Sequence, residues 1–414
     1  MADAKPRLRE IFSRPKLLII VALGAASGFP NQITESALQA WLKDAGFSNT
    51  TIGLLSYVSM PYLLKFLWAP FLDRYPLPFL GRRRGWMFFI QIALAAAIAA
   101  FALQDPKSSL TAVAITALIV VFFSASQDIV IDAYRTDVSL PHERGVAAAA
   151  NNLGYRASSW LAFAGALILA DLFGWRVAFL ALAAVMLAVT PVTWSAPEPD
   201  YRAPPPRSLR ESIVAPLREL LGSPGALGLL FVIVTFKIGN AFALKLFTPF
   251  LMDLGFTKTE IGLVAKAVLT TSAIVGGVLG GLWMIRLGLL RAMLLFGALQ
   301  TVTTLAFYLL AVTGKNFPLM IAATAIENVS AAMGNIAEVA LIMALCNSRF
   351  SAFQYALLSV FAMAPRYLLG GPAGWLADHG GWGIYFVVAF MAGLPGLIMV
   401  WLMRDRIAAL DDKR

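Results

Sequence analysis

The sequence predicts an all-α polytopic membrane protein with twelve transmembrane helices in two parallel six-helix repeats. Three observations predict it: an apolar composition, twelve apolar segments of membrane-spanning length, and two internal sequence repeats. Of the 414 residues, 59% are hydrophobic and 14% are charged. A soluble domain carries only about 45–50% apolar and about 25% charged residues. The composition therefore indicates an integral membrane protein.

The twelve apolar segments define the spans, because about 20 apolar residues cross a bilayer. They cover approximately residues 17–42, 52–72, 86–104, 109–136, 145–171, 175–195, 225–252, 260–286, 291–312, 317–346, 351–376 and 382–403. A basic arm, residues 1–16, precedes the first of them and resembles the start of a signal peptide. Since eleven more segments follow, we expect the first to be a span and not a cleaved leader.

The distribution of basic residues predicts the orientation of these spans. Most lysines and arginines lie in the N-terminal arm, in the connections that follow even-numbered spans, and in the C-terminal tail. The opposite side holds only Lys43, Lys107, Arg176, Lys258 and Lys315. Because basic residues stay on the cytoplasmic side, both termini are expected in the cytoplasm. The net charge of +10 follows from this asymmetry, so no nucleic-acid partner is indicated.

The longest polar connection divides six spans from six. It runs over residues 196–224, is rich in proline and charge, and contains an expected amphipathic helix at 208–221 that would lie on the membrane surface or over the bundle. The predicted domains are therefore a first half at 1–195, a cytoplasmic linker at 196–224 and a second half at 225–414.

Internal repeats support this division. The stretch DAGFSNTTIGLL at 44–55 matches DLGFTKTEIGLV at 253–264 at seven of twelve positions, with a shift of 209 residues. The stretch LADLFGW at 169–175 matches LADHGGW at 376–382 at five of seven positions, with a shift of 207. Two matches at nearly one offset predict two parallel six-span repeats, as in transporters of the major facilitator type.

The end of the fourth span carries the most informative charges. Asp128, Asp132 and Arg135 lie at i, i+4 and i+7, so a helix places them on one face below an apolar stretch. Carboxylates inside a membrane must face a bundle interior or a wet cavity, and they commonly mark proton or substrate pathways. The alternative is a structural ion pair. Asp128 lies a turn deeper than Asp132, which favours it as the proton-coupling residue and leaves Asp132 as the partner of Arg135.

The first two spans offer further polar groups. In span one, a proline interrupts regular helix just before Asn31 and Glu35, which then lie one turn apart and are expected to line a cavity. Glu35 is also a candidate proton-coupling residue. In span two, Lys65 has Tyr62 and Trp68 three residues to either side, an arrangement that could present rings to a sugar or could simply anchor the helix at the membrane interface.

Span five adds Asn152, Tyr155 and Arg156 on one helical face. Arg156 lies too deep in the span for easy access to the interface, so it is expected to need an acidic partner or an anionic ligand. Asp128 or Asp132 on span four is the intramolecular candidate. Pairing and substrate binding are both open at this point.

The second half carries a cationic set and an acidic set. The candidate substrate-binding residues there are Lys237, Asn240, Lys245, Lys266, Glu327, Asn335 and Arg366. Glu327 and Glu338 are eleven residues apart and share a helix face at different depths. They are interpreted either as counter-ions for the lysines or as a proton path, and Glu338 is retained as a proton-coupling candidate because the repeat places it near the equivalent of Asp132.

A basic turn between spans two and three resembles the signature of the major facilitator superfamily. Asp73-Arg74 is followed by Gly81 and by Arg82, Arg83 and Arg84. In that superfamily, an acid at the end of a span and a basic turn latch the cytoplasmic gate. A loop obeying only the charge bias would explain the arginines but would not require Asp73.

A closer resemblance is carried by several short blocks in order. They are GAASGFP at 24–30, LQAW at 38–41, KFLWAPFLDRY at 65–75, GRRRGW at 81–86, SASQDIVIDAYRTD at 124–137, ERG at 143–145 and LGYR at 153–156. The chain resembles the AmpG muropeptide permease family on these blocks. The resemblance implies a proton-driven importer of anhydromuropeptides, the peptidoglycan fragments of cell-wall recycling, in the bacterial inner membrane.

Other functions are less well supported by the residues. A transporter of another organic anion such as acetyl-CoA would use the same cationic residues and is the main alternative. An enzyme is not expected, because neither His142 nor His379 has a catalytic setting, and with a single cysteine, Cys346, no zinc site is indicated. No cofactor is expected. The expected partners are the substrate, protons and membrane lipids around a monomer.

Overall fold

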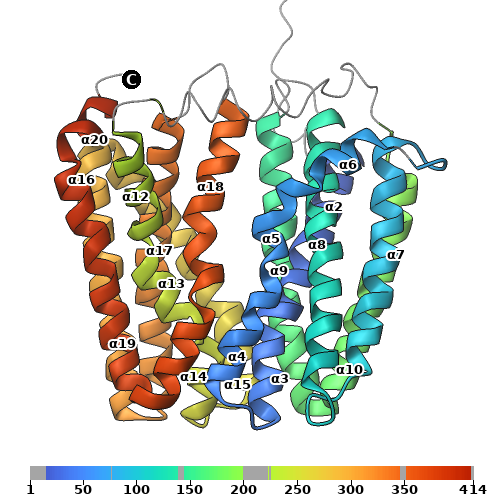
Figure 1. The fold of residues 1–414 in the computed structure, drawn as a ribbon, viewed down its shortest axis with the longest axis horizontal. Coiled ribbons are helices and arrows are strands. Elements are labelled where there is room, and N and C mark those ends of the chain that lie inside the picture. Colours follow the sequence, from blue (N-terminus) through green and yellow to red (C-terminus); the bar gives the residue numbers. More distant parts are fainter. Residues whose placement is uncertain are drawn as a thin grey trace, which may run out of the picture. The chain divides into compact units, whose positions relative to one another are not determined.

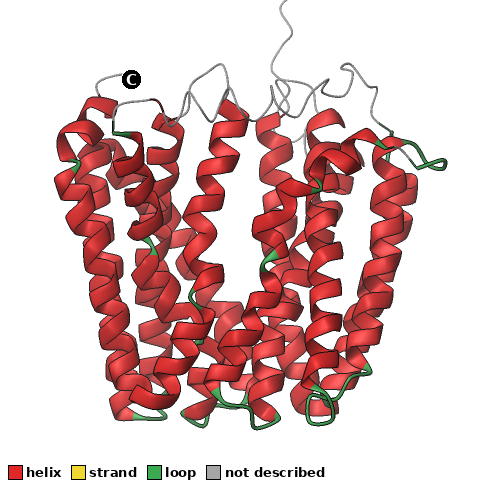
Figure 2. Ribbon diagram, in the orientation of Figure 1, coloured by secondary structure: helices red, strands yellow, loops and turns green. Residues whose placement is uncertain are grey.

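The computed structural model describes residues 15–75, 77–138, 144–198, 222, 225–345 and 351–411, and the described elements are all helical (Figures 1 and 2). Backbone contacts divide the chain into two compact units. The first unit is Met1–Trp41 with Val58–Pro205, and the second unit is Leu42–Tyr57 with Pro206–Arg414. The boundary after Pro205 lies in the predicted linker, whose expected amphipathic helix at 208–221 is outside the described residues.

The first unit is built from helices of the first half of the chain. Their bounds are α2 Pro15–Gln32, a π-helical segment Ile33–Ala37, α3 Leu38–Asp44, α5 Pro61–Leu64, a 3₁₀ segment Lys65–Leu67, α6 Ala69–Arg74, α7 Arg82–Ala102, α8 Leu110–Val138, α9 Arg144–Phe173 and α10 Trp175–Ser195. The last residues of α3 belong to the second unit.

The second unit contains the helices of the second half of the chain and one helix of the first half. Their bounds are α4 Asn49–Leu55, α12 Ala226–Phe236, α13 Ile238–Lys245, α14 Phe247–Asp253, α15 Lys258–Val264, a π-helical segment Ala265–Leu269, α16 Thr270–Thr313, α17 Phe317–Leu345, α18 Ser351–Leu368, α19 Gly370–Leu402 and α20 Arg404–Asp411. A 3₁₀ segment, Ser56–Ser59, follows α4 at the unit boundary.

The helices agree with the predicted spans. Nine helical stretches within the described residues are long and apolar enough to cross a membrane. Two of them run through a glycine with non-helical backbone angles, Gly288 in α16 and Gly381 in α19, and each is therefore two helices joined at a sharp turn. The predicted second span is divided into short helices between Asn49 and Arg74, so no single helix there has spanning length. The prediction of an all-helical polytopic membrane protein is confirmed.

Close contact between α2 and α9 organises the first unit. A β-carbon on Gly24 would lie 2.3 Å from the backbone oxygen of Asn151, and one on Gly28 would lie 2.2 Å from that of Tyr155. On α9, a β-carbon on Gly154 would lie 1.9 Å from the backbone oxygen of Val21. Small residues four apart allow two membrane helices to approach this closely. The contact places polar residues of α2 beside polar residues of α9.

An apolar core holds the second unit together. Phe236, Phe296, Met293 and Leu341 are buried in one cluster formed by α12, α16 and α17 with their neighbours. In a membrane, packing of this kind and interhelical hydrogen bonds replace the hydrophobic effect as the attraction between helices. The core therefore provides a rigid frame for the polar side chains that the same helices carry.

Candidate functional site

Several candidate residues lie where helices are irregular. Lys237 and Leu246, with ψ of 5° and 32°, interrupt the path from α12 through α13 to α14 (Figure 1). Lys65 begins the 3₁₀ segment between α5 and α6. Glu35 and Lys266 each lie in a π-helical segment. Interrupted helices at membrane depth are tolerated where they line a cavity, and they mark binding sites in transporters.

Asp128 is the centre of a polar cluster in the first unit. Ser27 Oγ on α2 donates a hydrogen bond to Asp128 Oδ1 on α8. The neighbouring Gln127 Nε2 donates to the backbone oxygen of Ala26 at 2.6 Å. Lys65 and Asp132 lie within electrostatic range of the Asp128 carboxylate. The cluster thus combines one half-buried acid with a neutral donor, a cation and a second acid.

Asp132 differs from Asp128 in its surroundings. Its Oδ1 lies 3.2 Å from Arg135 Nη2, and 52% of the Asp132 side chain is exposed. The Arg135 side chain is 25% exposed. The two acids that one sequence motif supplies are therefore distinct: Asp132 pairs with a cation near the helix end, whereas Asp128 is hydrogen-bonded inside the unit.

Two hydrogen bonds hold the broken second span against α8. Tyr62 and Ser124 share a hydrogen bond of 2.7 Å between their hydroxyl groups, and Tyr62 is buried. Trp68 Nε1 donates to Ser126 Oγ at 2.9 Å. Both rings are thus held by serines of the motif that also contains Asp128. This arrangement fixes the position of Lys65, which lies between them in the chain.

Polar side chains of α2 and α9 form two further hydrogen bonds in the first unit. Asn31 Nδ2 donates to the Tyr155 hydroxyl at 3.3 Å, and Asn31 Oδ1 is buried without a described hydrogen bond. Arg156 Nε donates to Asn152 Oδ1 at 3.2 Å, and Arg156 is exposed. The expected pairing of Arg156 with a span-four aspartate is therefore not seen among the described contacts. Asp132, one of the two candidates, pairs instead with Arg135 on its own helix.

The basic turn is held by acids that the sequence analysis did not assign to it. Arg83, only 7% exposed, places Nε 2.8 Å from Asp137 Oδ2. The backbone N–H groups of Arg83 and Arg84 donate to the two carboxylate oxygens of Glu198 at 3.2 and 3.4 Å. Arg84 Nη1 also donates to the backbone oxygen of Ala196 at 2.7 Å. The side chains of Asp73, Arg74 and Arg82 lie outside the described residues.

A buried ion pair dominates the polar core of the second unit. Lys237 Nζ lies 3.2 Å from Glu338 Oε2 and donates to Asn335 Oδ1 at 2.6 Å. The Glu338 side chain is 4% exposed and the Lys237 side chain 21%. The lysine at the break between α12 and α13 is thus tied to two consecutive turns of α17.

Glu327 has a different set of partners. Asn240 Nδ2 on α13 donates to Glu327 Oε1 at 2.8 Å, and Thr303 Oγ1 on α16 donates to Glu327 Oε2 at 2.7 Å. Glu327 is 0% exposed. The two acids on one face of α17, expected to act alike, therefore divide into an ion-paired residue and a residue held by neutral donors.

The remaining cations of the second unit lie further along the same helices. Lys245 is buried, and its Nζ donates to the backbone oxygen of Arg366 at 2.7 Å. Arg366 follows Pro365 in α18. The side chain of Lys266 lies outside the described residues. Lys245 thus binds a carbonyl in the last turn of α18, which ends at Leu368 and where carbonyl groups lack helical partners.

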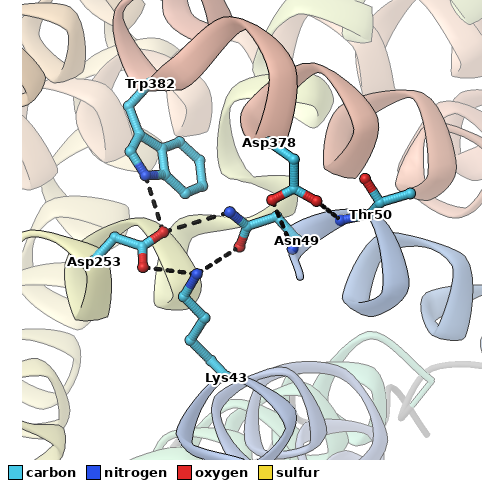
Figure 3. Close-up of polar contacts among 6 residues, drawn as sticks. All are labelled: Lys43, Asn49, Thr50, Asp253, Asp378 and Trp382. Carbon is cyan, nitrogen blue, oxygen red and sulfur yellow. Dashed lines mark hydrogen bonds and ion pairs between the residues drawn. The ribbon is translucent and has the colours of Figure 1, made fainter. Parts of the chain in front are cut away.

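A second polar network in the second unit holds the segment Leu42–Tyr57 (Figure 3). Lys43 Nζ lies 2.6 Å from Asp253 Oδ1, and Trp382 Nε1 donates to Asp253 Oδ2 at 3.1 Å. The Asp378 carboxylate accepts the backbone N–H groups of Asn49 and Thr50 at 2.9 and 2.6 Å, which caps α4.

Several residues that make these contacts are not among the candidates predicted from the sequence. Asp253, Asp378 and Trp382 had a signal, since they are shared positions of the two internal repeats. Ser27 and Thr303 had none, because a lone hydroxyl in an apolar helix commonly bonds its own backbone. Only tertiary packing reveals that these two hydroxyls face carboxylates.

Comparisons with known proteins identify the architecture. Residues 20–313 match the model of the Major Facilitator Superfamily. A bacterial homologue of the human lysosomal transporter Spinster, in an inward-facing and unoccupied conformation, superposes with a TM-score of 0.72 at 17% identity, covering 96% of this chain and 97% of that structure. A D-xylose–proton symporter superposes with a TM-score of 0.73 at 12% identity, covering 94% and 97%. At these identities the structures show the shared fold.

Curated relatives are closer in sequence. An anhydromuropeptide permease of Escherichia coli K12 is 42% identical over 399 residues, covering 96% of this chain and 81% of the relative. The putative transporter AmpG 4 of Rickettsia conorii is 30% identical over 411 residues, covering 97% and 99%. The similarity thus extends over both units of the chain.

Proposed function

Because the chain belongs to the AmpG permease family of the major facilitator superfamily, we propose that it imports anhydromuropeptides across a bacterial inner membrane together with protons. The observation that carries the proposal is the 42% identity with the E. coli anhydromuropeptide permease over 96% of the chain. The fold is that of a transporter and not of an enzyme. The proposal places both termini in the cytoplasm, in accordance with the distribution of basic residues.

The polar groups of the first unit suit the chemistry of this substrate. An anhydromuropeptide carries sugar hydroxyls, amides and peptide carboxylates. Lys65 and the exposed Arg156 supply cations for carboxylates, while Asn31, Asn152 and Tyr155 supply hydrogen-bonding partners for sugar and amide groups. Charge-assisted hydrogen bonds from a cation to a carboxylate are about twice as strong as neutral ones. The cations are therefore proposed to hold the peptide, and the neutral groups to orient the sugar.

Proton coupling is proposed for Asp128. Its partners within the first unit are Ser27, which is neutral, and the nearby Lys65, whose charge is available to a substrate carboxylate. When substrate engages Lys65, the stabilising effect of that cation on the Asp128 carboxylate weakens, which favours proton uptake. Asp132 keeps its partner Arg135 throughout and is proposed to remain charged. The carrier would expose this site alternately to the two sides of the membrane.

The deciding experiment uses purified full-length protein in liposomes with labelled anhydromuropeptide and an imposed pH gradient. We expect the wild type to accumulate substrate when protons flow in the direction of uptake, and the Asp128→Asn variant to exchange substrate without accumulating it. A wild-type protein that exchanges substrate but ignores the pH gradient would remove the symport proposal.

Competition in the same assay tests the substrate. Unlabelled anhydromuropeptide is expected to inhibit uptake of the label, whereas an equal concentration of acetyl-CoA is not. Inhibition by acetyl-CoA alone would support the organic-anion alternative. Uptake of the label by liposomes that contain no protein provides the baseline for both measurements.

A further inference from the structure

Glu327 lies in a pocket of neutral hydrogen-bond donors contributed by two other helices. Its side chain has no exposed area, and each of its carboxylate oxygens accepts one hydrogen bond, from Asn240 Nδ2 at 2.8 Å and from Thr303 Oγ1 at 2.7 Å. A buried carboxylate that remains charged normally requires a cation or several strong donors. Within the described residues, Glu327 makes no ion pair.

The described lysines on either side of Asn240 have contacts elsewhere, and the side chain of Lys266, in the segment Ala265–Leu269 that packs against α17, lies outside the described residues. Lys237, three residues before Asn240, is engaged by Glu338 and Asn335. Lys245, five residues after Asn240, donates to the backbone oxygen of Arg366. On α16, the stretch around Thr303 from Gln300 to Phe307 contains no ionisable side chain. The free-energy cost of burying the Glu327 charge is therefore offset by hydrogen bonds from an amide and a hydroxyl. No charged side chain among the described residues contributes to this offset.

Thr303 can satisfy Glu327 in both of its protonation states. Thr303 Oγ1 lies 2.7 Å from Glu327 Oε2 and 3.3 Å from the backbone oxygen of Gln300, and a hydroxyl carries one proton and two lone pairs. When Glu327 is charged, Thr303 donates to it. When Glu327 Oε2 is protonated, it donates to Thr303 Oγ1, and the threonine proton turns to the backbone oxygen of Gln300. Asn240 donates to the other oxygen in both states.

Glu338, eleven residues along the same helix, lacks this property. Its Oε2 is 3.2 Å from the Lys237 ammonium. Protonating Glu338 would leave a largely buried lysine without its counter-ion, which is strongly unfavourable. Among the described contacts, Glu327 can therefore change protonation state without breaking an ion pair, whereas Glu338 cannot.

From this geometry we propose that Glu327 is a proton-binding residue of the second unit, taking up a proton on Oε2 and releasing it in each transport cycle. The proton forms an O–H bond to Oε2 and leaves as that bond breaks, with Thr303 rotating between its two acceptors. This inference rests on the proposed proton symport and adds a second titrating acid to Asp128. It revises the assignment of Glu327 from the substrate-binding set to the proton pathway.

The principal test is Glu327→Gln, which is neutral and keeps the size of the side chain. In liposomes, the variant is expected to exchange labelled substrate at close to the wild-type rate. Its accumulation of substrate under the pH gradient and the substrate-induced uptake of protons that a pH-sensitive dye records should both fall below the wild-type values, because only Asp128 then titrates. If Glu327→Gln accumulates substrate as the wild type does, the inference is wrong, even though symport itself stands. If the wild type shows no response to the gradient, the proposed function fails first.

A second variant keeps the test valid if Glu327→Gln does not fold. Thr303→Val has nearly the same shape as threonine but cannot donate or accept a hydrogen bond. It is expected to retain gradient-driven uptake while shifting the pH profile of substrate exchange. Thr301→Val serves as the matched control, because Thr301 Oγ1 donates to the backbone oxygen of Gly297 and not to a carboxylate. An identical pH profile for Thr303→Val and the wild type would overturn the inference.

Discussion

The ion pair between Lys237 and Glu338 provides the sharpest test of the polar core. Replacing Glu338 with glutamine removes the only carboxylate described beside Lys237 Nζ, at 3.2 Å, and leaves the hydrogen bond to Asn335 in place. Two unit charges 3.2 Å apart interact by about 5 kcal/mol at an effective dielectric constant of about 20. Removing one partner of a buried pair costs about 3–5 kcal/mol. Because Lys237 is 21% exposed, the lower end of this range applies, and Glu338→Gln should lose about 3 kcal/mol of unfolding free energy.

The pair can be separated from its single residues by a double-mutant cycle. Lys237→Met should also destabilise the protein, since it leaves Glu338, the more deeply buried member, without a cation. The combined variant replaces a buried pair by neutral groups of similar volume, which is often neutral or even stabilising. We therefore expect it to lose clearly less than the sum of the two single losses, with a coupling energy of about 2–3 kcal/mol.

Unfolding of the purified protein by increasing SDS in a fixed amount of mild detergent, followed by tryptophan fluorescence, measures these differences. The reasoning is refuted if the double variant loses the sum of the two single losses, because the two charges would then be independent. Substrate exchange in liposomes should follow folding in all three variants, so a variant that folds normally but does not transport would assign the pair to substrate binding.

Three further predictions concern other parts of the chain. Lys65→Ala and Arg156→Ala should each weaken anhydromuropeptide binding in detergent about tenfold or more while shifting the melting temperature little. Both cations lie in the proposed peptide site, and a charge-assisted hydrogen bond contributes about 1.5–3 kcal/mol. Reduced stability with unchanged affinity would instead assign the two cations a structural role. Gly154→Leu should separate α2 from α9 and lower the free energy of unfolding by at least about 1–3 kcal/mol, because even a β-carbon would lie 1.9 Å from the backbone oxygen of Val21. A melting temperature equal to that of the wild type would contradict the helix contact. Lys43→Asp and Asp253→Lys should each lower transport and stability. The combined variant should restore part of both, because the ion pair, 2.6 Å in the wild type, can form again with the two charges exchanged. No recovery would show that Asp253 acts mainly through its hydrogen bonds with Asn49 and Trp382.

The fold could be predicted because its main determinant acts on composition and segment length. A bilayer requires long apolar helices, and that requirement appears directly in the twelve segments. The repeats predicted two parallel halves because a duplicated span boundary needs the same turn in both copies. The interruptions at Lys237 and Leu246 were not predicted, since nothing in an apolar run of this kind shows where tertiary contacts replace helical hydrogen bonds.

The candidate site was predicted in part. Intramembrane charges are costly, so Asp128, Lys237, Glu327 and Glu338 stand out in the sequence without any structure. The residues that bind these charged groups could not be predicted, because helical spacing determines only which residues share a face of one helix. For example, Glu327 and Glu338 share a face of α17, yet Glu327 is bound by Asn240 and Thr303, whereas Glu338 pairs with Lys237.

The sequence by itself thus determined the class of protein, the number of spans, the repeat and which buried groups carry charge. Only the tertiary structure decided which of those charges are neutralised by an ion pair and which are held by neutral donors. The physical reason is that the free energy of a charge in a low-dielectric interior depends on atoms within a few ångströms. For Glu338 those atoms include the Lys237 ammonium, whereas for Glu327 they belong to Asn240 and Thr303 on two other helices.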